Sequence, residues 1–307
     1  MKTGIIRLLY QKGLFSLSGT TKCGLDSLGM VVDKSLIGVA AVKYSHSPND
    51  DAMLAAKPYL RALKIDPVKE IDFDAYPFCI PAVRELEKLD FHADVTFLVG
   101  ENGAGKSTLL EAMAVAWGFN AEGGNQNTGF STANAHSDLH TYLRTVKSFK
   151  RPKTGYFLRA ESFFNVASNI EELDAEPGLG GLIGPSYGVR SLHKQSHGEA
   201  FLALLQNKFR PNGFYMLDEP ESALSPNRQL AALAIIHRLA QANCQFIIAT
   251  HSPILLAYPN ARIYLLDQSG LTETRYEDTE HYTTTRHFLN NPAGMLEQLF
   301  AEENEDD

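Results

Sequence analysis

A glycine-rich turn, Gly-Glu-Asn-Gly-Ala-Gly-Lys-Ser at residues 100–107, constrains this chain more than any other feature. The apolar run at residues 94–99 predicts a buried strand before the turn, and the apolar spacing over residues 108–117 predicts a helix after it. In that context, successive backbone N–H groups face inward and the helix dipole points at the same space. The turn therefore predicts a phosphate-binding loop.

The loop also supplies a cation and a hydroxyl group. Lys106 is expected to reach the β- and γ-phosphates of a nucleotide, and Ser107 is expected to be a Mg²⁺ ligand. We predict that the nucleotide contacts the whole turn and the start of the helix, that is, Gly100, Glu101, Asn102, Gly103, Ala104, Gly105, Lys106, Ser107 and Thr108.

Two acidic residues follow a second apolar run. Residues 213–217 predict a buried strand that leads directly into Asp218 and Glu219. In open α/β sheets, the binding crevice lies at the carboxyl ends of the strands. Asp218 suits Mg²⁺ binding and Glu219 suits a general base or a group that positions water, although a strand that ends in Asp-Glu is commonplace when taken alone.

A histidine follows a third apolar run. Residues 244–249 predict a strand that ends in Thr-His-Ser-Pro, and the amphipathic helix expected over residues 227–242 makes the two strands parallel. His251 would then lie at the same sheet edge as the acids, where it can sense the γ-phosphate. A lone histidine at a strand end is usually structural, but three strand ends with complementary groups favour a shared site.

A capping pattern precedes a further apolar helix. Ser196 and Glu199 in Gln-Ser-His-Gly-Glu have the S-x-x-E spacing ahead of a helix over residues 200–209. The exposed N-terminus of such a helix can bind an anion. Taken alone, the pattern is best explained as an ordinary helix cap.

The remaining sequence sets the domain organisation. Residues 1–52 are expected to be an N-terminal extension, either poorly ordered, with Met53 nearer the natural start, or a small subdomain. One α/β domain is expected over residues 53–300, with an antiparallel β region at its beginning and a helical subdomain at about 120–200. Residues 301–307 predict an acidic, solvated tail.

The composition bears on the cellular location, on the charge of the surface and on possible metal sites. The three cysteines have no metal-binding or disulfide spacing, and no apolar stretch approaches the length needed to span a bilayer, so we expect a cytoplasmic protein. The net charge of −8 excludes a surface that is basic everywhere but leaves a local basic groove open. The His-x-Asp-x-His run at residues 136–140 is interpreted as solvated surface rather than a metal site.

Together, these elements resemble the ABC class of P-loop ATPases, over residues 58–290. Walker A would be GENGAGKS, the signature QSHGE, Walker B FYMLDEP, the D-loop SALS and the switch histidine His251. The resemblance implies an α/β fold with a mainly parallel sheet, ATP and Mg²⁺ as ligands, and ATP hydrolysis by a head-to-tail homodimer. Ser196 and Gly198 of one chain would then contact the γ-phosphate held by the other.

The DEPESALSP and ATHSP segments are more similar to stand-alone ATPases of the RecF-like and overcoming-lysogenization-defect-like groups than to transporter subunits. Departures from transporter subunits include QSHGE in place of LSGGQ, Ser225 at the end of the D-loop and Glu221 after the proline. Glu161, which follows a strand expected at residues 156–160, is a candidate for the Q-loop position, and Tyr76 and Phe78 are candidates for the aromatic residue that stacks on adenine.

Three functions follow from this resemblance. The first is an ATPase that acts on nucleic acid or on a partner protein, as in repair or defence. The alternatives are an ATP-binding subunit of an ABC transporter and a nucleotide-responsive scaffold with very slow turnover.

Overall fold

The computed structural model describes residues 57–121, 123–124, 137–159 and 197–302, together with two short strands near the N-terminus. The chain divides into two units, Met1–Ala55 and Ala56–Asp307. In the first unit, β1 (Met30–Val31) pairs antiparallel with β2 (Lys43–Tyr44). The second unit holds all the predicted motifs.

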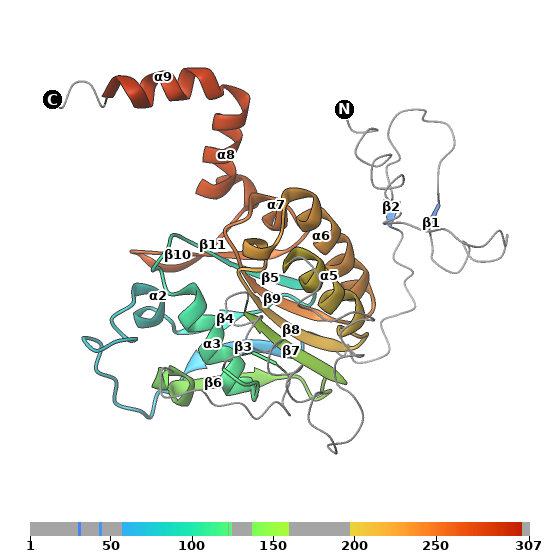
Figure 1. The fold of residues 1–307 in the computed structure, drawn as a ribbon. Coiled ribbons are helices and arrows are strands. Elements are labelled where there is room, and N and C mark those ends of the chain that lie inside the picture. Colours follow the sequence, from blue (N-terminus) through green and yellow to red (C-terminus); the bar gives the residue numbers. More distant parts are fainter. Residues whose placement is uncertain are drawn as a thin grey trace, which may run out of the picture. The chain divides into compact units, whose positions relative to one another are not determined.

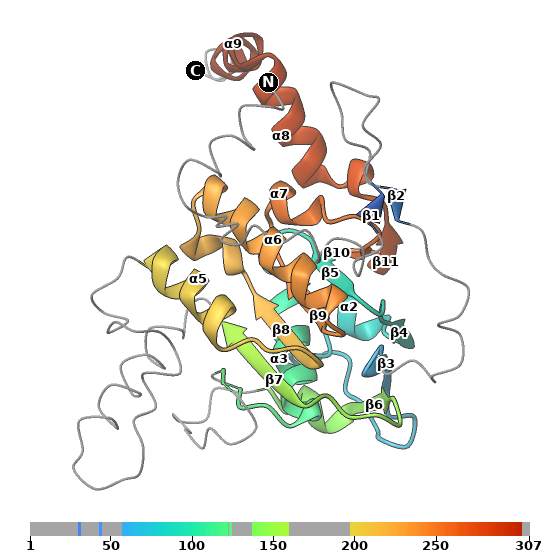
Figure 2. The same ribbon diagram turned by 90° about the vertical axis from the view of Figure 1, so that its right-hand side faces the viewer.

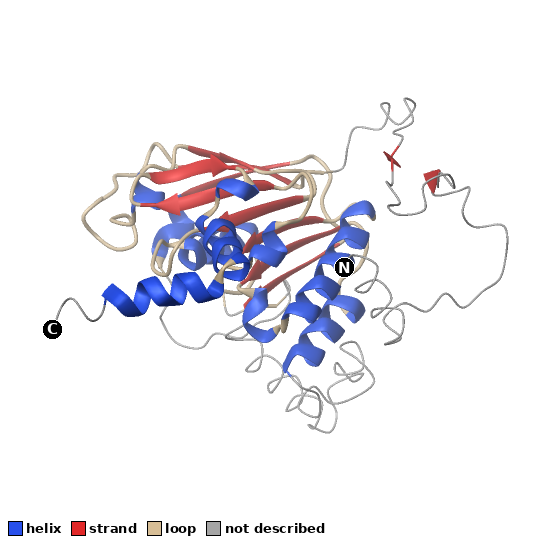
Figure 3. Cartoon of the chain, turned by 90° about the horizontal axis from the view of Figure 1, so that it is seen from above, coloured by secondary structure: helices blue, strands red, loops and turns tan. Residues whose placement is uncertain are grey.

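A six-stranded sheet forms the centre of the second unit, in the order β11-β10-β5-β9-β8-β7 (Figures 1 and 3). All neighbouring pairs are parallel except β11 with β10. The strands are β5 (Val95–Val99), β7 (Thr154–Arg159), β8 (Gly213–Asp218), β9 (Gln245–Ala249), β10 (Arg262–Asp267) and β11 (Gly270–Thr274). The predicted α/β fold with a mainly parallel sheet is confirmed.

Apolar layers cover both faces of this sheet, which is why every residue of β5, β8 and β9 is buried. One layer contains α5 (His197–Asn207), α6 (Pro226–Gln241) and α7 (Pro253–Leu256). The other contains α3 (Lys106–Trp117) and the smaller antiparallel sheet. Figure 1 shows α5, α6 and α7 together on one side and α3 with β3 and β6 on the other.

The antiparallel β region is also confirmed. Its strand order is β4-β3-β6, formed by Lys88–Asp90, Leu60–Ile65 and Leu143–Lys147. The strands β6 and β7 lie inside the segment at about 120–200, where we expect a helical subdomain and a strand at residues 156–160 that corresponds to β7. Besides the 3-10 helix η2 (Asp138–Tyr142) and the start of α5, the described part of that segment contains these two strands and loops, and the rest lies outside the described residues.

Short helices and a C-terminal pair complete the fold. They are α2 (Pro81–Arg84), the 3-10 helices η5 (Pro220–Ala223) and η6 (Tyr276–Asp278), α8 (Glu280–Asn290) and α9 (Pro292–Glu302). Figures 1 and 2 show α8 leading away from the sheet, with α9 at its end. None of the described helices is both long enough and apolar enough to cross a membrane.

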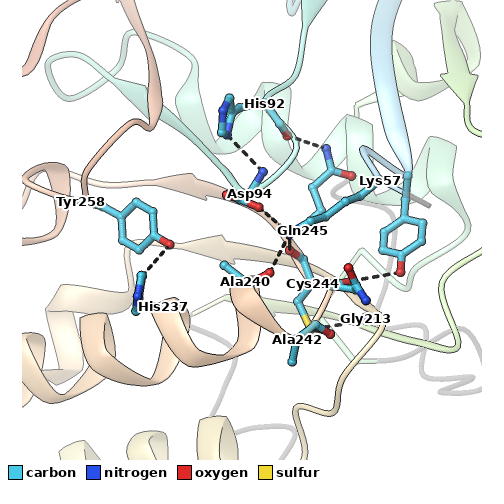
Figure 4. A network of polar contacts seen from close by, with 12 residues as sticks. Lys57, His92, Asp94, Gly213, His237, Ala240, Ala242, Cys244, Gln245 and Tyr258 are labelled. Carbon is cyan, nitrogen blue, oxygen red and sulfur yellow. Dashed lines mark hydrogen bonds and ion pairs between the residues drawn. The ribbon is translucent and has the colours of Figure 1, made fainter. Parts of the chain in front are cut away.

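A polar network joins the antiparallel sheet to the start of β9 (Figure 4). The side chain of Gln245, which is fully buried, accepts a hydrogen bond from Leu60 N at 2.9 Å and donates to Leu60 O and His92 O at 2.9 and 3.0 Å. Lys57 pairs with Asp94 nearby. This network lies at the amino-terminal ends of β5 and β9, on the side of the sheet away from the carboxyl ends of the parallel strands.

We expect Gln245→Leu to lower the free energy of unfolding by about 2–4 kcal/mol, because it leaves buried backbone groups of β3 without a partner. That loss corresponds to a melting temperature lower by roughly 4–16 °C for a domain of this size. Gln241→Leu, at an exposed position at the end of α6, is the matched control. An equal effect of both changes in thermal unfolding would contradict a bridging role for Gln245.

Candidate nucleotide-binding site

The glycine-rich turn connects β5 to α3, as predicted, and two of its glycines are required by close packing. A Cβ at Gly100 would approach the carbonyl oxygen of Leu266 to 2.2 Å. Gly105 has φ of 92°, and a Cβ there would lie 2.7 Å from Ile80 Cγ2. The turn is therefore held against the end of β10 and against the residue that precedes α2, in a backbone path that side chains would block.

Lys106 is the first residue of α3 and is only 4% exposed. Its Nζ donates hydrogen bonds to Gly100 O at 2.9 Å and to Glu101 O at 2.8 Å, inside the curve of the turn. Burial lowers the pKa of Lys106, whereas the nearby carboxylates of Glu219 and Asp218 act in the opposite direction. The amine is thus held by weak acceptors that phosphate oxygens can replace.

The hydroxyl of Ser107 and the carboxylate of Asp218 lie together. Ser107 Oγ donates to Asp218 Oδ1 at 3.0 Å, although the residues are 111 positions apart in sequence. Both provide hard oxygen ligands, which suit Mg²⁺. The donor set therefore fits the metal that the sequence predicts.

Arg159, which the sequence does not mark as a site residue, faces the carboxylate of Asp218. Arg159, at the end of β7, pairs in register with Asp218, and its Nε lies 3.7 Å from Asp218 Oδ2. Its Nη1 also donates to Glu111 Oε2 on α3 at 2.7 Å. The guanidinium thus connects β7, β8 and α3 beside the predicted metal ligand.

Glu219 adopts a left-handed backbone conformation, with φ of 47°, immediately after β8. Its backbone N–H donates to Ala249 O, so the turn is fixed to the end of β9. Its Oε1 lies 3.6 Å from His251 Nε2. Uncommon conformations of this kind in non-glycine residues concentrate at functional sites, where they orient a side chain.

The side chain of Glu221 accepts a hydrogen bond from the backbone of His251. Its Oε1 accepts a hydrogen bond from His251 N at 2.5 Å, and within the described residues its buried Oε2 has no partner. Glu221 is one of the departures from transporter subunits in the sequence. The contact explains the glutamate, because it fixes the turn that presents the imidazole.

A second histidine, His281, contacts the first. His251 Nδ1 and His281 Nε2 are 3.1 Å apart, so one ring donates to the other. Burial lowers the pKa of His281, as do the nearby His251 and Lys106, and this favours a neutral His281 at pH 7. His251 Nε2 is buried without a hydrogen bond to any described residue and faces Glu219.

Sequence reasoning missed His281 because α8 was not predicted. An N-capping Thr279, whose hydroxyl accepts from Tyr282 N, marks the beginning of this helix in the sequence. That signal gives the helix start but not the position of the helix beside His251.

A cavity of about 420 Å³ lies over the turn and is lined by Tyr76, Ile80, Asn102, Gly103, Gly105, Lys106, Ser107, Thr108 and Glu219. Tyr76 is 67% exposed, and its hydroxyl is 3.3 Å from Thr108 Oγ1. Phe78 instead belongs to the core, where it packs edge-on against Tyr142. Of the two aromatic candidates, only Tyr76 borders the cavity.

The signature segment is described only in part. Ser196 and the Q-loop candidate Glu161 lie outside the described residues. Gly198 is buried at the start of α5, where a Cβ would lie 2.7 Å from Ala223 O. Glu199 pairs with Arg228 of α6 at 3.1 Å. Close packing against the D-loop therefore accounts for Gly198 within one chain.

Two family models match the chain. One, described as an AAA domain, matches residues 76–172. The second is an AAA-domain model whose description names an AbiEii toxin of a type IV toxin–antitoxin system, and it matches residues 166–257. Together, the matches run from the segment before Walker A to the switch histidine.

Curated relatives are ATP-binding proteins of ABC transporters. An uncharacterized ABC transporter ATP-binding protein of Haemophilus influenzae is 28% identical over 56% of this chain and 69% of its own length. The vitamin B12 import ATP-binding protein BtuD of Salmonella typhimurium is 29% identical over 52% of this chain and 66% of its own length. The yeast ABC transporter PDR18 is 26% identical over 58% of this chain but only 14% of its own length.

Solved structures with a similar chain path include the SMC head domain from Thermotoga maritima, with a TM-score of 0.38, 16% identity and coverage of 70% of this chain and 98% of that one. Another is cbiO1 from Clostridium perfringens, part of an ABC transporter complex, with a TM-score of 0.43, 14% identity and coverage of 78% and 99%.

Proposed function

Since this chain is a P-loop ATPase of the ABC class, we propose that two copies close head to tail around Mg-ATP and hydrolyse it at the shared interface. One observation carries the catalytic part of this proposal. The carboxyl ends of β5, β9 and β8 are neighbours in the sheet, and they carry Lys106, His251 and Asp218 with Glu219, respectively.

In this proposal, the residues divide the work as follows. Lys106 and the backbone N–H groups of the turn bind the β- and γ-phosphates, and Ser107 and Asp218 would hold Mg²⁺, which would neutralise charge on the phosphate oxygens. Glu219 orients a water molecule and accepts its proton as the water oxygen attacks the γ-phosphorus. The bond from that phosphorus to the bridging oxygen then breaks, giving ADP and phosphate.

His251 would stabilise the transferred phosphoryl group. Its Nε2 has no hydrogen bond to a described residue and faces Glu219, which suits donation to a γ-phosphate oxygen. Such donation needs the proton on Nε2, so Nδ1 of a neutral ring accepts from His281 Nε2. We therefore propose His281 as a residue that fixes the tautomer of His251.

The dimer completes the site. Ser196 and Gly198 of the partner chain would approach the γ-phosphate from the opposite side, at the beginning of α5. Gly198 packs tightly on the D-loop of its own chain, and this packing fixes the start of α5 beside the segment that follows Glu219.

For the biological role, we propose a cytoplasmic ATPase that acts on nucleic acid or on a partner protein. The departures at QSHGE, Glu221 and Ser225 favour this role over the alternative, an ATP-binding subunit of a transporter, which the curated relatives favour. Affinity capture from native cells with ATP-trapped Glu219→Gln separates the two. Enrichment of nucleic acid or a non-membrane protein supports the first, and enrichment of a permease supports the second.

Tyr76→Ala is expected to raise the dissociation constant for ATP by about 5- to 150-fold, since stacking of a base on an aromatic ring contributes about 1–3 kcal/mol. Tyr76→Phe keeps the ring and should bind ATP nearly as the original protein does. Inorganic triphosphate, which has no base, should bind all three proteins alike. Equal ATP affinity of the alanine variant in calorimetry would show that Tyr76 does not stack on adenine.

A further inference from the structure

A second and larger cavity, of about 540 Å³, lies away from the nucleotide site. It is formed by the end of α3, the loop between β6 and β7, and the start of β7. Its lining residues are Trp117, Phe119, Lys147, Ser148, Phe149, Lys150, Arg151, Pro152, Lys153, Thr154 and Gly155. We call this region the β6–β7 pocket.

The β6–β7 pocket is strongly basic in an acidic protein. From Leu139 to Ala160 the sequence holds six lysine and arginine residues and no aspartate or glutamate, whereas the whole chain has a net charge of −8. Four of the cations line the cavity: Lys147, Lys150, Arg151 and Lys153. Within the described part of the chain, none of the four forms an ion pair, so their charge is not neutralised there.

Aromatic rings alternate with these cations. Phe149 is 65% exposed, and Lys150 Nζ lies 5.8 Å from the centre of its ring. Lys147 Nζ lies 4.4 Å above the ring of Trp117. Partial burial and the neighbouring Arg151 lower the pKa of Lys147. An anion bound here would relieve repulsion between these cations.

The basic surface continues along the same sheet edge. Lys153 N donates to Asn212 O at 2.8 Å, which brings the loop beside the start of β8. The exposed Arg210 lies two residues before Asn212. Cations from two separate segments thus lie along the edge of the main sheet formed by β7 and the start of β8. A row of cations of this length suits an extended anion with several phosphate groups better than a single phosphate group.

We propose that the β6–β7 pocket binds single-stranded nucleic acid, with the cations on the phosphates and Phe149 stacked on a base. This inference deepens the proposed function by naming the class of partner. Unpaired cations around an exposed aromatic ring are the combination that binds single strands without sequence preference. An anionic membrane is less suited, because the cations line a hollow, and a divalent metal is not suited, because the lining has no acid.

The position of the pocket suggests how it communicates with the nucleotide. The helix α3 begins at Lys106 in the glycine-rich turn and ends at Trp117 in the pocket lining. Its 12 residues span about 18 Å. One rigid helix therefore connects the two sites, and binding of a strand at one end can alter ATP hydrolysis at the other.

The test is fluorescence anisotropy of a labelled single-stranded oligonucleotide without ATP, so a failure of the ATPase proposal cannot affect it. We expect Lys150→Glu/Arg151→Glu to weaken binding at least 30-fold. The slope of log affinity against log salt should fall by about 0.7 for each phosphate that a cation no longer binds. Arg286→Glu, an exposed reversal on α8, is the control for a change of charge elsewhere and should change binding less than threefold.

A second variant separates stacking from charge. Phe149→Ala should weaken oligonucleotide binding about 5- to 150-fold and leave the salt slope unchanged. Melting temperature and ATP hydrolysis without nucleic acid should stay those of the original protein in every variant, which excludes misfolding. Equal binding by the double variant and the Arg286→Glu control would overturn the proposal. Binding only to anionic vesicles, and not to the oligonucleotide, would also overturn it.

Discussion

Replacing Lys106 with alanine is expected to weaken ATP binding at least 100-fold. The amine is buried inside the turn and, among the described residues, donates to two backbone carbonyl oxygens, so it is positioned to bind phosphate oxygens instead. Hydrogen bonds to charged groups contribute about 1.5–3 kcal/mol each, and loss of two of them exceeds a factor of 100 in affinity. Isothermal titration calorimetry with Mg²⁺ and ATP measures the change.

Two controls belong with this variant. Lys106→Met keeps most of the aliphatic stem and removes the charge, and it should lose ATP affinity as Lys106→Ala does. Lys64→Ala removes an exposed lysine of β3 and should bind ATP normally. If Lys106→Ala binds ATP with unchanged affinity while it keeps its fold, the nucleotide does not occupy the glycine-rich turn.

Glu219→Gln is expected to bind ATP and to hydrolyse it at least 100-fold more slowly, since a positioned general base contributes about 10²- to 10⁴-fold to a rate. The amide is nearly the same size as the carboxylate, and Lys106, Ser107 and Asp218 stay in place. Phosphate release measures turnover, and calorimetry measures ATP binding. The exposed Glu277→Gln on η6 is the matched control and should retain full activity.

The order of strand, turn and helix was predictable because each step has a local cause. Uninterrupted apolar runs specify β5, β8 and β9, since both faces of a parallel sheet are buried. The amphipathic α6 between β8 and β9 makes those strands parallel, and parallel strands bring their carboxyl ends to one edge. It could therefore be predicted, without any knowledge of tertiary contacts, that the site residues after these strands lie close together.

The contacts around that edge could not be predicted in the same way. Glu221, Arg159 and His281 each contact a predicted site residue that is distant in sequence. For Arg159, the cause is the register of β7 with β8. For His281, it is the path of the chain after β11. Neither is encoded in a local pattern.

In the region at 120–200, the strand expected at residues 156–160 corresponds to β7, but β6 was not predicted, for a related reason. Its polar, glycine-rich composition suggested a helical lobe, but β6 completes the antiparallel sheet and β7 the edge of the main sheet. Pairing partners already present in β3 and β8 stabilise these strands, and such long-range pairing outweighs a weak local preference. The charge of the loop between β6 and β7 has no local pattern that marks it as a binding site, since the cavity it lines also needs Trp117 and Phe119.

Sedimentation velocity of Glu219→Gln, with and without Mg-ATP, tests the central claim most directly. Because ATP bridges two chains in this proposal, it should shift the variant from monomer to dimer by linkage of ligand binding to association. Adding Ser196→Arg should leave ATP binding intact but abolish the dimer, since a bulky cation would fill the helix N-terminus meant for the γ-phosphate. A double variant that still dimerises with Mg-ATP would contradict the head-to-tail arrangement, although the nucleotide site in each chain would stand.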